Sequence, residues 1–439
     1  MALRHVIVGN GPAGLTAAET IRLHDADAHI TIVGGEDHPF YSRPGLAYVL
    51  TGAIPEKQLV ARTDKDYERA QIRRTVGTVR RIEPAGHRIE LTDGRTLAYD
   101  CLLLAVGARA VRPELPGIDL EGVVTLDNLD DARRILRLAK KAKRACVVGG
   151  GITALELAEG LAAQGVETRY LMRGDRYWSG VLDPHESTLV EARLVEDGIR
   201  LHHGVELAAV IGNKGRVTAV ETRAGDRLSC DLLGVAVGVQ PRLELAQQIG
   251  LPTGRGIWTD ETLQTADPYV FAAGDVAEVL DPATGRRGVD SLWSIAIEQG
   301  RTAGENMTGL HRPYRRPAPF NVTKLGGVTT TIIGAVGSGG RDGDLVTLAR
   351  GDSGAWRERL DSFAVAADTG VNHLRLMLGA NLIVGAVVMG DQALSRGLQH
   401  LIREQVDISL VRDLLVDQAA EAHQVVAALA ERMVSLGTL

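Results

Sequence analysis

A glycine-rich turn near the start of the chain has the spacing of a phosphate-binding loop. It stands in VIVGNGPAG, between a run of β-branched residues and a helix rich in alanine and leucine. Gly9 would allow the tight turn, and Gly11 would let backbone N–H groups approach a pyrophosphate. Gly14 would let the helix lie close to the strand, and the positive end of that helix would attract the phosphate charge. This spacing predicts the binding of a dinucleotide.

The same pattern returns about 140 residues later along the chain. The segment Arg144–Asp175 repeats His5–Glu36 as strand, glycine turn, helix and strand. Gly149 and Gly151 hold the first two glycine positions, and Ala154 holds the third, where the motif permits a methyl group. One such turn would be weak support, but two copies, each between a strand and a helix, predict two βαβ units. Two bound dinucleotides indicate hydride transfer between them.

The second copy ends in RYLMRGDR, at the place where a carboxylate usually closes the strand and binds a ribose. Met172 takes that place here and is followed by Arg173 and Arg176. Loss of the acid removes its repulsion of a ribose 2′-phosphate, and an arginine can donate charge-assisted hydrogen bonds to such a phosphate. We therefore favour NADPH over NADH. The alternative is that both arginines are solvated and that NADH binds without a ribose clamp.

The cysteines and the paired histidines lack the spacing of a redox or metal centre. Three inert core thiols are expected, because each cysteine lies in a short apolar run that predicts a buried strand. They are Cys101, Cys146 and Cys230, and none precedes them in the first 100 residues. No thiolate is therefore expected to relay electrons. His202 and His203 stand in a polar stretch before a predicted strand and are expected to face solvent, so no metal site is predicted.

The length and net charge of the chain limit the classes to which the protein can belong. The chain has 439 residues and a net charge of −6, and 45% of its residues are hydrophobic. This length predicts two or three domains. A general nucleic-acid or membrane-surface binder would need a basic excess, which is missing. An apolar strand that begins at Leu3 leaves no room for a signal peptide, and Glu156 and Glu159 interrupt the longest apolar stretch, so a cytoplasmic protein without a membrane span is expected.

Strands with short turns follow each βαβ unit and position the two glycine turns. Thr75–Glu83 and His87–Leu91 predict a hairpin before the strand Cys101–Ala105. Arg216–Arg223 and Ser229–Val237 repeat this arrangement around the turn AGDR. The alternation of strands with helices predicts an α/β fold.

The last third of the chain has its own pattern. A helix is predicted from about Trp293 to Thr308, and the segment His311–Phe320, rich in proline and arginine, predicts a linker. Beyond the linker, strands and two helices predict a third unit. The last helix, roughly Val416–Ser435, has an apolar face that either belongs to the core or contacts a second copy of the chain or another partner.

Along essentially its whole length the sequence resembles the FAD-dependent pyridine nucleotide-disulfide oxidoreductase superfamily. The matching stretches are VIVGNGPAG, HPFYSRPGL, YDCLLLAVGA, VVGGGITALELA, GVAVGVQP, VFAAGDVAE and WSIAIEQGRTAGENMTG. Within the superfamily it is similar to the branch without a redox-active disulfide, which includes ferredoxin and rubredoxin reductases and the flavin module of the nitrite reductase large subunit. The resemblance implies two Rossmann-like dinucleotide-binding domains and a C-terminal α+β interface domain. The implied bounds are 1–112 and 242–317 for the FAD domain, 113–241 for the NAD(P) domain, and 318–439 for the interface and dimerisation domain.

The resemblance also implies contacts to the cofactors. The FAD pyrophosphate would lie against Gly9, Gly11, Pro12, Ala13 and Gly14. Arg43 and Pro44 would lie near the flavin and its phosphates, Gly274 and Asp275 near the ribityl chain and pyrophosphate, and Trp293 close to the isoalloxazine. Further contacts to FAD or NAD(P) are implied for Gly35, Val79, Ala105, Gly107, Gly149, Gly151, Ile152, Ala154, Met172, Arg173, Arg176 and Gly238.

Two positions depart from the family pattern. The acid that binds the adenosine ribose of FAD usually follows the Val-Gly of the second strand directly, whereas here Gly35 intervenes and Glu36 is the candidate. Tyr48 stands where ferredoxin reductases have a lysine able to pair with the glutamate of LELA, here Glu156. This loss tilts the likeness towards the nitrite reductase module. Tyr48, Glu156 and Trp293 are the candidate catalytic residues, although Glu156 is expected either to help hold the nicotinamide or simply to be satisfied by a neighbour.

These inferences predict an enzyme that passes a hydride from NADPH or NADH to N5 of FAD. Without a cysteine relay, the flavin itself would pass the electrons on. Three destinations stay open. The first is a redox protein such as ferredoxin, rubredoxin or a reductase subunit, and the second is a small acceptor such as oxygen or a quinone. The third belongs to another class, a flavin-binding scaffold or redox-sensing subunit without turnover.

Overall fold

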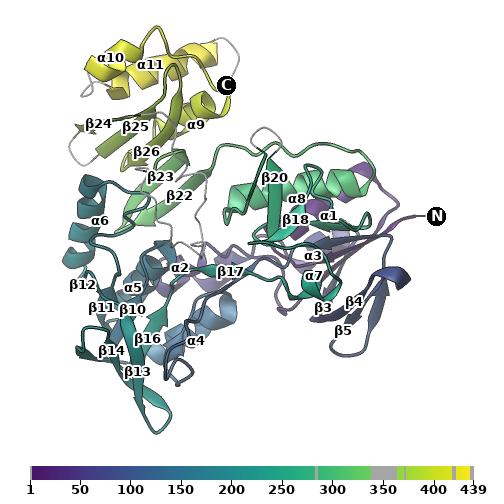
Figure 1. The fold of residues 1–439 in the computed structure, drawn as a ribbon, viewed down its shortest axis with the longest axis horizontal. Coiled ribbons are helices and arrows are strands. Elements are labelled where there is room, and N and C mark those ends of the chain that lie inside the picture. Colours follow the sequence, from purple (N-terminus) through teal and green to yellow (C-terminus); the bar gives the residue numbers. More distant parts are fainter. Residues whose placement is uncertain (1, 282–284, 338–362, 370–371, 418–421, 436–439) are drawn as a thin grey trace. The chain divides into compact units, whose positions relative to one another are not determined.

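The computed structural model describes residues 2–281, 285–337, 363–369, 372–417 and 422–435. The chain divides into two compact units, each assembled from segments that lie far apart in the sequence (Figure 1). Unit 1 comprises Met1–Ala110, Asp127–Leu129 and Val239–Arg316. Unit 2 comprises Val111–Leu126, Asp130–Gly238 and Pro317–Leu439.

A five-stranded parallel sheet forms the centre of unit 1, with the strand order β19-β7-β1-β2-β3. Its strands are β1 (Arg4–Val8), β2 (His29–Gly34), β3 (Ile72–Val76), β7 (Cys101–Leu104) and β19 (Val270–Ala272). The branched aliphatic residues of these strands are largely buried, as expected of a parallel sheet covered by helices. Two helices lie side by side in this unit, α1 (Pro12–His24) and α8 (Trp293–Met307) (Figure 1).

Unit 1 also contains smaller elements. Its two three-stranded sheets are β4-β5-β6 and β18-β20-β21, and β8 pairs with β17. The strands are β4 (Val79–Glu83), β5 (Arg88–Leu91), β6 (Thr96–Ala98), β8 (Ala108–Ala110), β17 (Val239–Pro241), β18 (Ile257–Thr259), β20 (Ala277–Asp281) and β21 (Arg286–Gly288). The short helices are α2 (Leu46–Leu50), η1 (Glu56–Leu59), α3 (Asp64–Arg69), η2 (Pro84–Gly86) and α7 (Glu244–Gln248).

Unit 2 repeats the architecture of unit 1 around a second parallel sheet, with the order β12-β11-β10-β16-β9. The sheet strands are β9 (Val123–Val124), β10 (Arg144–Val148), β11 (Glu167–Leu171), β12 (Arg200–His202) and β16 (Leu232–Val235). The helices are α4 (Leu129–Ala139), α5 (Ile152–Ala163) and α6 (Pro184–Glu196), and the antiparallel strands are β13 (Leu207–Asn213), β14 (Arg216–Thr222) and β15 (Arg227–Ser229). In both sheets the strand before the glycine turn is central and the strand after the helix is its neighbour, so the prediction of two Rossmann-like domains is confirmed.

The C-terminal part of unit 2 is an antiparallel sheet with the order β22-β23-β26-β25-β24. Its strands are β22 (Phe320–Leu325), β23 (Val328–Gly334), β24 (Phe363–Thr369), β25 (Asn372–Leu378) and β26 (Ile383–Met389). The helices that follow are α9 (Ser395–Arg403), α10 (Arg412–Asp417) and α11 (Ala422–Ser435). Leu376 of the sheet shares a buried core with Leu398 of α9 and Val426 of α11. The predicted α+β class of this part is confirmed, and none of the described helices has the length and apolar character that crossing a bilayer requires.

Two predicted strands are wrong because each is in fact two strands. The run Thr75–Glu83 divides at Gly77, whose N–H donates to the carbonyl oxygen of Gly34 at 2.8 Å and closes the parallel sheet. The run Ser229–Val237 divides after Ser229, because the carboxylate of Asp231 turns to accept hydrogen bonds from the backbone N–H groups of Lys143 and Arg144. In both cases an uninterrupted apolar run hides a change from one sheet to another.

Two other predicted segments differ in detail. The last predicted helix, Val416–Ser435, is helical up to Asp417 and again from Ala422, while residues 418–421 lie outside the described residues. The predicted linker is held firmly at its first half, where Tyr314 is buried and Arg316 forms two hydrogen bonds with Asp290 at 2.8 and 2.9 Å. This half belongs to unit 1, and the chain enters unit 2 at Pro317.

Candidate functional site

The first glycine turn is shaped by close contact between backbone segments. Gly9 has a φ of +120°, and a Cβ added to it would lie 2.0 Å from the carbonyl oxygen of Ala105. A Cβ on Gly14 would lie 2.0 Å from the carbonyl oxygen of Gly9, so the helix can approach the strand only because this residue is glycine. A Cβ on Gly11 would meet no atom within 4 Å. Two glycines therefore build the turn, and the third faces open space.

The open space at Gly11 has the properties of an anion site. Gly11 caps α1 without any side-chain hydrogen bond, and Pro12 occupies the first helical position, which needs no N–H partner. The first turn of a helix presents unpaired N–H groups and a partial positive charge to whatever lies before it. A phosphate diester would fit these donors, so the turn satisfies the requirement that the resemblance to dinucleotide-binding proteins sets.

Helix α8 places a second backbone segment beside this turn. The N–H of Gly274 donates to Oε1 of Gln299 at 2.7 Å, and Gly274 has a φ of +80°. A Cβ on Gly300 would lie only 2.3 Å from the carbonyl oxygen of Ala13, so α8 touches the first turn of α1. The carboxylate-bearing Asp275 follows directly on Gly274. Gln299 and Gly300 are positioning residues that the sequence analysis missed, and glycines spaced by four in α8 were the available signal.

The predicted ribose acid, Glu36, belongs to a network of its own. Its carboxylate forms an ion pair with Arg43 and accepts a hydrogen bond from the Tyr41 hydroxyl at 2.6 Å. The same hydroxyl accepts the N–H of Leu129 at 3.1 Å, and Arg43 donates to the carbonyl oxygen of Asp127. Burial raises the pKa of Tyr41, so this side chain remains a neutral donor. The structure therefore ties Glu36 to Arg43 through residues that were predicted separately, and it adds Tyr41 and Asp127, which the sequence analysis missed.

The aromatic candidate at the start of α8 rests on a second aromatic ring. The rings of Trp293 and Phe40 lie 5.5 Å apart between centroids. The N–H of Phe40 donates to the Tyr67 hydroxyl at 3.2 Å, and that hydroxyl donates to Oδ1 of Asn10 at 2.7 Å. A continuous set of contacts thus joins Trp293 to the first glycine turn. Tyr48 lies half-buried on α2, within the same unit.

The second glycine turn repeats the first in its hydrogen bonding. The N–H of Gly149 donates to the carbonyl oxygen of Leu171, just as the N–H of Gly9 donates to that of Val33. A Cβ on Gly149 would lie 2.2 Å from the carbonyl oxygen of Ala236, which corresponds to the clash with Ala105 in the first copy. Gly151 caps α5 without a side-chain hydrogen bond, as Gly11 caps α1. The duplication seen in the sequence is therefore a duplication of geometry.

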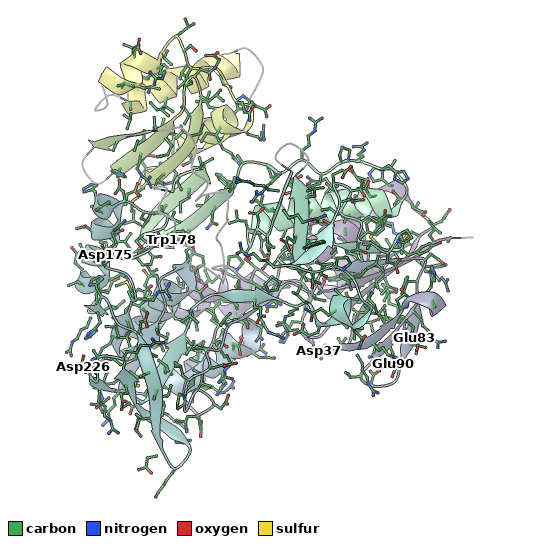
Figure 2. The ribbon with its side chains drawn as sticks, viewed as in Figure 1. Asp37, Glu83, Glu90, Asp175, Trp178 and Asp226 are labelled. Atoms are coloured by element: carbon green, nitrogen blue, oxygen red, sulfur yellow. The ribbon has the colours of Figure 1, made fainter. Side chains whose placement is uncertain are left out.

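The strand end of the second copy separates its three candidate residues. Met172 is buried, so its side chain belongs to the core and a nucleotide could meet only its backbone. Arg173 is exposed, and its side chain makes no hydrogen bond or ion pair with any residue that the structure describes. Arg176 is half-buried, pairs with Asp175 at 3.3 Å and donates to the carbonyl oxygen of Ser179 at 3.4 Å. Figure 2 labels Asp175 on this loop. Arg173 thus has exposed donors free to bind a ligand, whereas the one unpaired donor of Arg176, its Nε, is buried.

The other implied contact residues lie in the two units as follows. Val79 and Ala105 are buried, and Pro44 and Gly35 are exposed. Gly107 and Gly238 both have positive φ values, of 65° and 133°, near the points where the chain leaves one unit for the other. The remaining three lie on α5, where Ile152 and Ala154 are buried and Glu156 is half-buried.

The three cysteines and the paired histidines differ in how far they are buried. Cys146 and Cys230 are buried, and burial raises the pKa of the third thiol, Cys101, to about 11. The paired histidines lie at the end of β12 and before β13, and the expected exposure to solvent is met by His203, which is exposed, whereas His202 is half-buried. Nε2 of His203 lies 3.1 Å from a carboxylate oxygen of Glu191.

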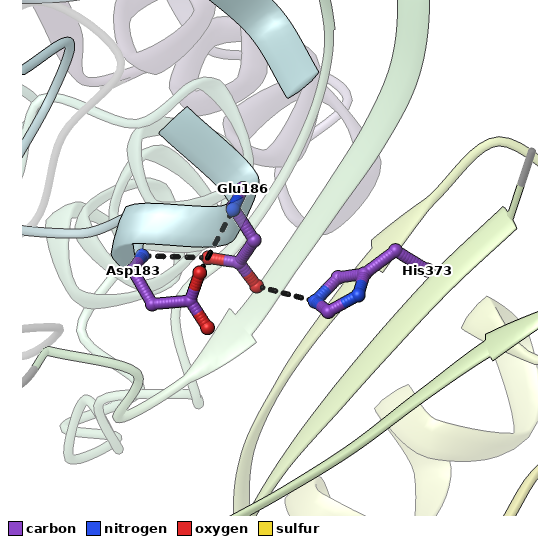
Figure 3. Close-up of side chains that lie close together, drawn as sticks. All are labelled: Asp183, Glu186 and His373. Atoms are coloured by element: carbon purple, nitrogen blue, oxygen red, sulfur yellow. Dashed lines mark hydrogen bonds and ion pairs between the residues drawn. The ribbon is translucent and has the colours of Figure 1, made fainter. Parts of the chain in front are cut away.

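One cluster of ionisable groups was not expected from the sequence. Possible ligand atoms of Asp183, Glu186 and His373 lie within 4.8 Å of one another (Figure 3). Three groups of these types are often metal ligands. Here, however, Arg375 donates from Nε and Nη2 to the two oxygens of Glu186 at 2.8 and 2.9 Å. A guanidinium so close to the carboxylate repels a metal ion, so the cluster is a buried ion-pair network.

Comparisons with known proteins agree with this geometry. Residues 3–300 match the family described as pyridine nucleotide-disulphide oxidoreductase. The ferredoxin–NAD(+) reductase component of the biphenyl dioxygenase system of Paraburkholderia xenovorans is 32% identical over 87% of this chain and 93% of the relative. An NADH oxidase of Methanocaldococcus jannaschii is 32% identical over 74% of each chain. The ferredoxin reductase for the CYP199A2 system of Rhodopseudomonas palustris has a TM-score of 0.82 at 26% identity, and the match covers 92% of this chain and 95% of that structure.

Both the residues matched and the duplicated geometry lead to one conclusion. The family match covers the two glycine turns and ends within α8, and these are the elements that form the two candidate dinucleotide sites. The chain belongs to the pyridine nucleotide-disulphide oxidoreductase family.

Proposed function

We propose that this chain is an FAD-dependent NAD(P)H reductase that delivers electrons to a separate redox protein. FAD would bind at the first glycine turn in unit 1, and NAD(P)H would bind at the second glycine turn in unit 2. The observation that carries the proposal is the repeated turn, in which Gly9 and Gly149 make matching hydrogen bonds and Gly11 and Gly151 leave matching helix ends uncapped. The predicted domain bounds, which end at residues 112, 241 and 317, are part of this proposal.

The residues of the chain act by binding and orientation. The N-terminal turns of α1 and α5 hold the phosphates of the two nucleotides, and Asp275 offers a carboxylate to a hydroxyl of the flavin side chain. When bound, FAD supplies the chemistry of accepting a hydride and releasing electrons one at a time. Trp293, supported by Phe40, provides an apolar surface for the flavin ring. Glu156 on α5 and Tyr48 on α2 stay candidates for positioning the reactive rings.

The cysteines support an electron route that does not involve a thiol. The three thiols are buried or half-buried, Cys101 and Cys146 in strands and Cys230 between β15 and β16, and the raised pKa of Cys101 keeps that thiol protonated. The first hundred residues, which carry the first βαβ unit, contain no cysteine. Electrons would therefore pass from the flavin directly to the acceptor.

The acceptor proposed first is a small iron–sulfur protein of the ferredoxin type. The relative from the biphenyl dioxygenase system, which matches nearly its full length, is named as a ferredoxin reductase component. A second candidate activity is an NAD(P)H oxidase that uses oxygen or another small acceptor. It is favoured by the similarity to the archaeal NADH oxidase. A flavin-binding scaffold without turnover is the third candidate.

The proposed pyridine nucleotide is NADPH. Arg173 has free donors just after β11, and Met172 takes the position of the usual ribose-binding acid. A homodimer through the C-terminal part and a cytoplasmic location stay predictions. Leu410, Leu414 and Val416 are exposed apolar residues around α10 and would suit the dimer contact.

One experiment tests these alternatives together. The purified protein is reconstituted with FAD and mixed anaerobically with NADPH or NADH while the visible flavin band is followed. Bleaching by either nucleotide supports a reductase, and failure of both leaves the scaffold. Reoxidation is then compared between oxygen and a reducible ferredoxin. Fast reoxidation by ferredoxin and slow reoxidation by oxygen support the first proposal, and the reverse supports the oxidase.

A further inference from the structure

Helix α6 forms hydrogen bonds with the loop that precedes it, residues 172–183 between β11 and α6. The N–H of Tyr177 donates to Oε1 of Glu191 at 2.6 Å, and its carbonyl oxygen accepts the Ser187 hydroxyl at 2.8 Å. Trp178, labelled in Figure 2, is buried with a φ of 49°, a left-handed conformation that a bulky residue adopts only when its surroundings enforce it. The loop that carries Arg173 is therefore fixed by hydrogen bonds to α6.

The C-terminal sheet supplies a further support for the same loop. Arg375 lies on β25 with 3% of its surface exposed. Its Nη2 donates to the carbonyl oxygen of Val181 at 2.8 Å, and its Nη1 donates to that of Val336 at 2.8 Å. The guanidinium thus binds the last part of the nucleotide loop and its own C-terminal sheet at once. An ammonium group could not reproduce this planar, multi-donor arrangement.

Glu186 completes the connection from the side of α6. Its carboxylate is fully buried and accepts hydrogen bonds from Arg375. It also accepts one from Nε2 of His373 at 3.1 Å and one from the N–H of Asp183 at 2.9 Å (Figure 3). Asp183 in turn caps α6 by accepting the N–H of Glu186 at 2.8 Å. The N-cap residue Asp183 and the first turn of α6 are therefore bonded to the C-terminal sheet, chiefly through the Glu186 carboxylate and also through an ion pair of Asp183 with Arg375 at 3.7 Å.

The composition of this network indicates a positional role. A buried ion pair can often be replaced by apolar residues of similar size without loss of stability, so the charges alone do not explain it. What an apolar pair would lose is the set of bonds to the carbonyl oxygens of Val181 and Val336. The bond to Val181 links the nucleotide loop to the C-terminal sheet, and the bond to Val336 holds the guanidinium within the C-terminal part.

We propose that Arg375 is a positioning residue for the pyridine-nucleotide site. By binding the carbonyl oxygen of Val181 and the carboxylate of Glu186, it fixes the end of the loop whose start carries Arg173. The C-terminal sheet, which contributes no glycine turn, thereby sets the affinity for the nucleotide 2′-phosphate. This inference rests on the proposed function in assigning the nucleotide to that loop.

The test compares three main variants, and Arg375→Lys as an intermediate, with the wild-type full chain. Arg375→Met removes the loop contact and leaves Glu186 as a buried charge. The double variant Glu186→Met/Arg375→Met removes both charges, so its thermal stability is expected to recover. Arg403→Met removes an exposed arginine of the same sheet-and-helix part, which within the described ranges pairs with its neighbour Glu404, and serves as the control. Hydrogen exchange of residues 174–182 and the affinity for NADP⁺ and NAD⁺ are measured for each.

The double variant separates positioning from stability. Exchange in the loop is expected to rise about tenfold or more in both Arg375 variants, with no change in Arg403→Met. The dissociation constant for NADP⁺ is expected to rise about tenfold in both, including the double variant with recovered stability. Arg375→Lys should fall between, because it keeps the charge but not the four bonds.

Several outcomes would overturn the proposal. Loop exchange and NADP⁺ affinity that recover together with stability in the double variant would leave Arg375 a merely structural residue. Wild-type-like exchange in Arg375→Met would do the same. If the wild-type protein binds neither nucleotide, the proposed function fails. The exchange data still decide whether Arg375 holds the loop.

Discussion

The backbone N–H of Gly274 donates a 2.7 Å hydrogen bond to Oε1 of Gln299, a buried side chain on α8. This bond fixes a residue with φ of +80° next to the first turn of α1, where the pyrophosphate of FAD is proposed to bind. It joins two segments that the sequence analysis had treated separately, the AAGD turn and the helix that begins at Trp293.

We expect Gln299→Leu to lower FAD occupancy. The leucine leaves the Gly274 N–H buried without an acceptor, at a cost of about 1–3 kcal/mol. The turn would then move away from the geometry that places Asp275. Flavin absorbance per chain after gel filtration measures the occupancy. Gln299→Glu, which keeps an acceptor oxygen, should retain more FAD than Gln299→Leu. Equal occupancy in wild type and Gln299→Leu would contradict the positioning role.

The glycines of the first turn should separate folding from binding. A methyl on Gly11 meets no protein atom within 4 Å, whereas a methyl on Gly14 would lie 2.0 Å from the carbonyl oxygen of Gly9. Gly11→Ala is therefore expected to leave the melting temperature of the flavin-free protein unchanged but to reduce FAD binding. Gly14→Ala should lower both. Titration with FAD and thermal unfolding of the flavin-free protein measure the two effects. Unimpaired FAD affinity in Gly11→Ala would remove this turn as the pyrophosphate site.

Short-range features of the site could be predicted from the sequence, and long-range ones could not. The glycine turns and the arginines after β11 follow from residue type and spacing within one βαβ unit, where the backbone path is set locally. The bond between Gly274 and Gln299, and that between Glu186 and Arg375, join residues that are far apart in the chain. Nothing in their local sequence marks the partner.

The split strands show a second limit of the same kind. Thr75–Glu83 has a continuous β pattern, and only the pairing of Ile72–Val76 with β2 shows that the chain changes sheets at Gly77. Likewise, the sequence puts Met172 in the place of the usual ribose-binding acid, and only the structure shows that its side chain is buried because β11 continues its inward-facing alternation there. Only the pairing of strands in the folded protein shows where such a strand ends and which of its side chains are buried.

The free donors of Arg173 should determine the choice of nucleotide. We expect Arg173→Ala to raise the KM for NADPH about tenfold or more, because a charge-assisted hydrogen bond contributes about 1.5–3 kcal/mol. The KM for NADH should stay unchanged. Arg200→Ala, which removes an exposed arginine of the same unit that pairs with Glu167, is the charge-matched control. Initial rates with both nucleotides and a dye acceptor measure the effect. An unchanged NADPH KM would favour the alternative, in which the arginines are solvated and NADH is the substrate.

Glu159 on α5 should make the stability of unit 2 depend on pH. Burial raises its pKa to about 7, against a reference of 4.5, although N–H groups of Gly327 and Gly326 in the β22–β23 turn partly lower it. The folded state prefers the protonated form of Glu159. The stability that this acid contributes is therefore fully present below about pH 4.5 and is lost as the pH rises through about 7. Glutamine keeps the hydrogen-bonding groups and has no charge to lose.

We therefore expect Glu159→Gln to gain thermal stability relative to wild type as the pH is raised from about 5 to about 8, by a few degrees in melting temperature. Melting curves across this range, recorded for both proteins in one set of buffers, measure the difference. Glu196→Gln, at the exposed end of α6, controls for a general change of net charge and should show a nearly constant offset. A constant offset for Glu159→Gln as well would show that Glu159 does not change protonation in this range. The contact between α5 and the β22–β23 turn would then contribute no pH dependence.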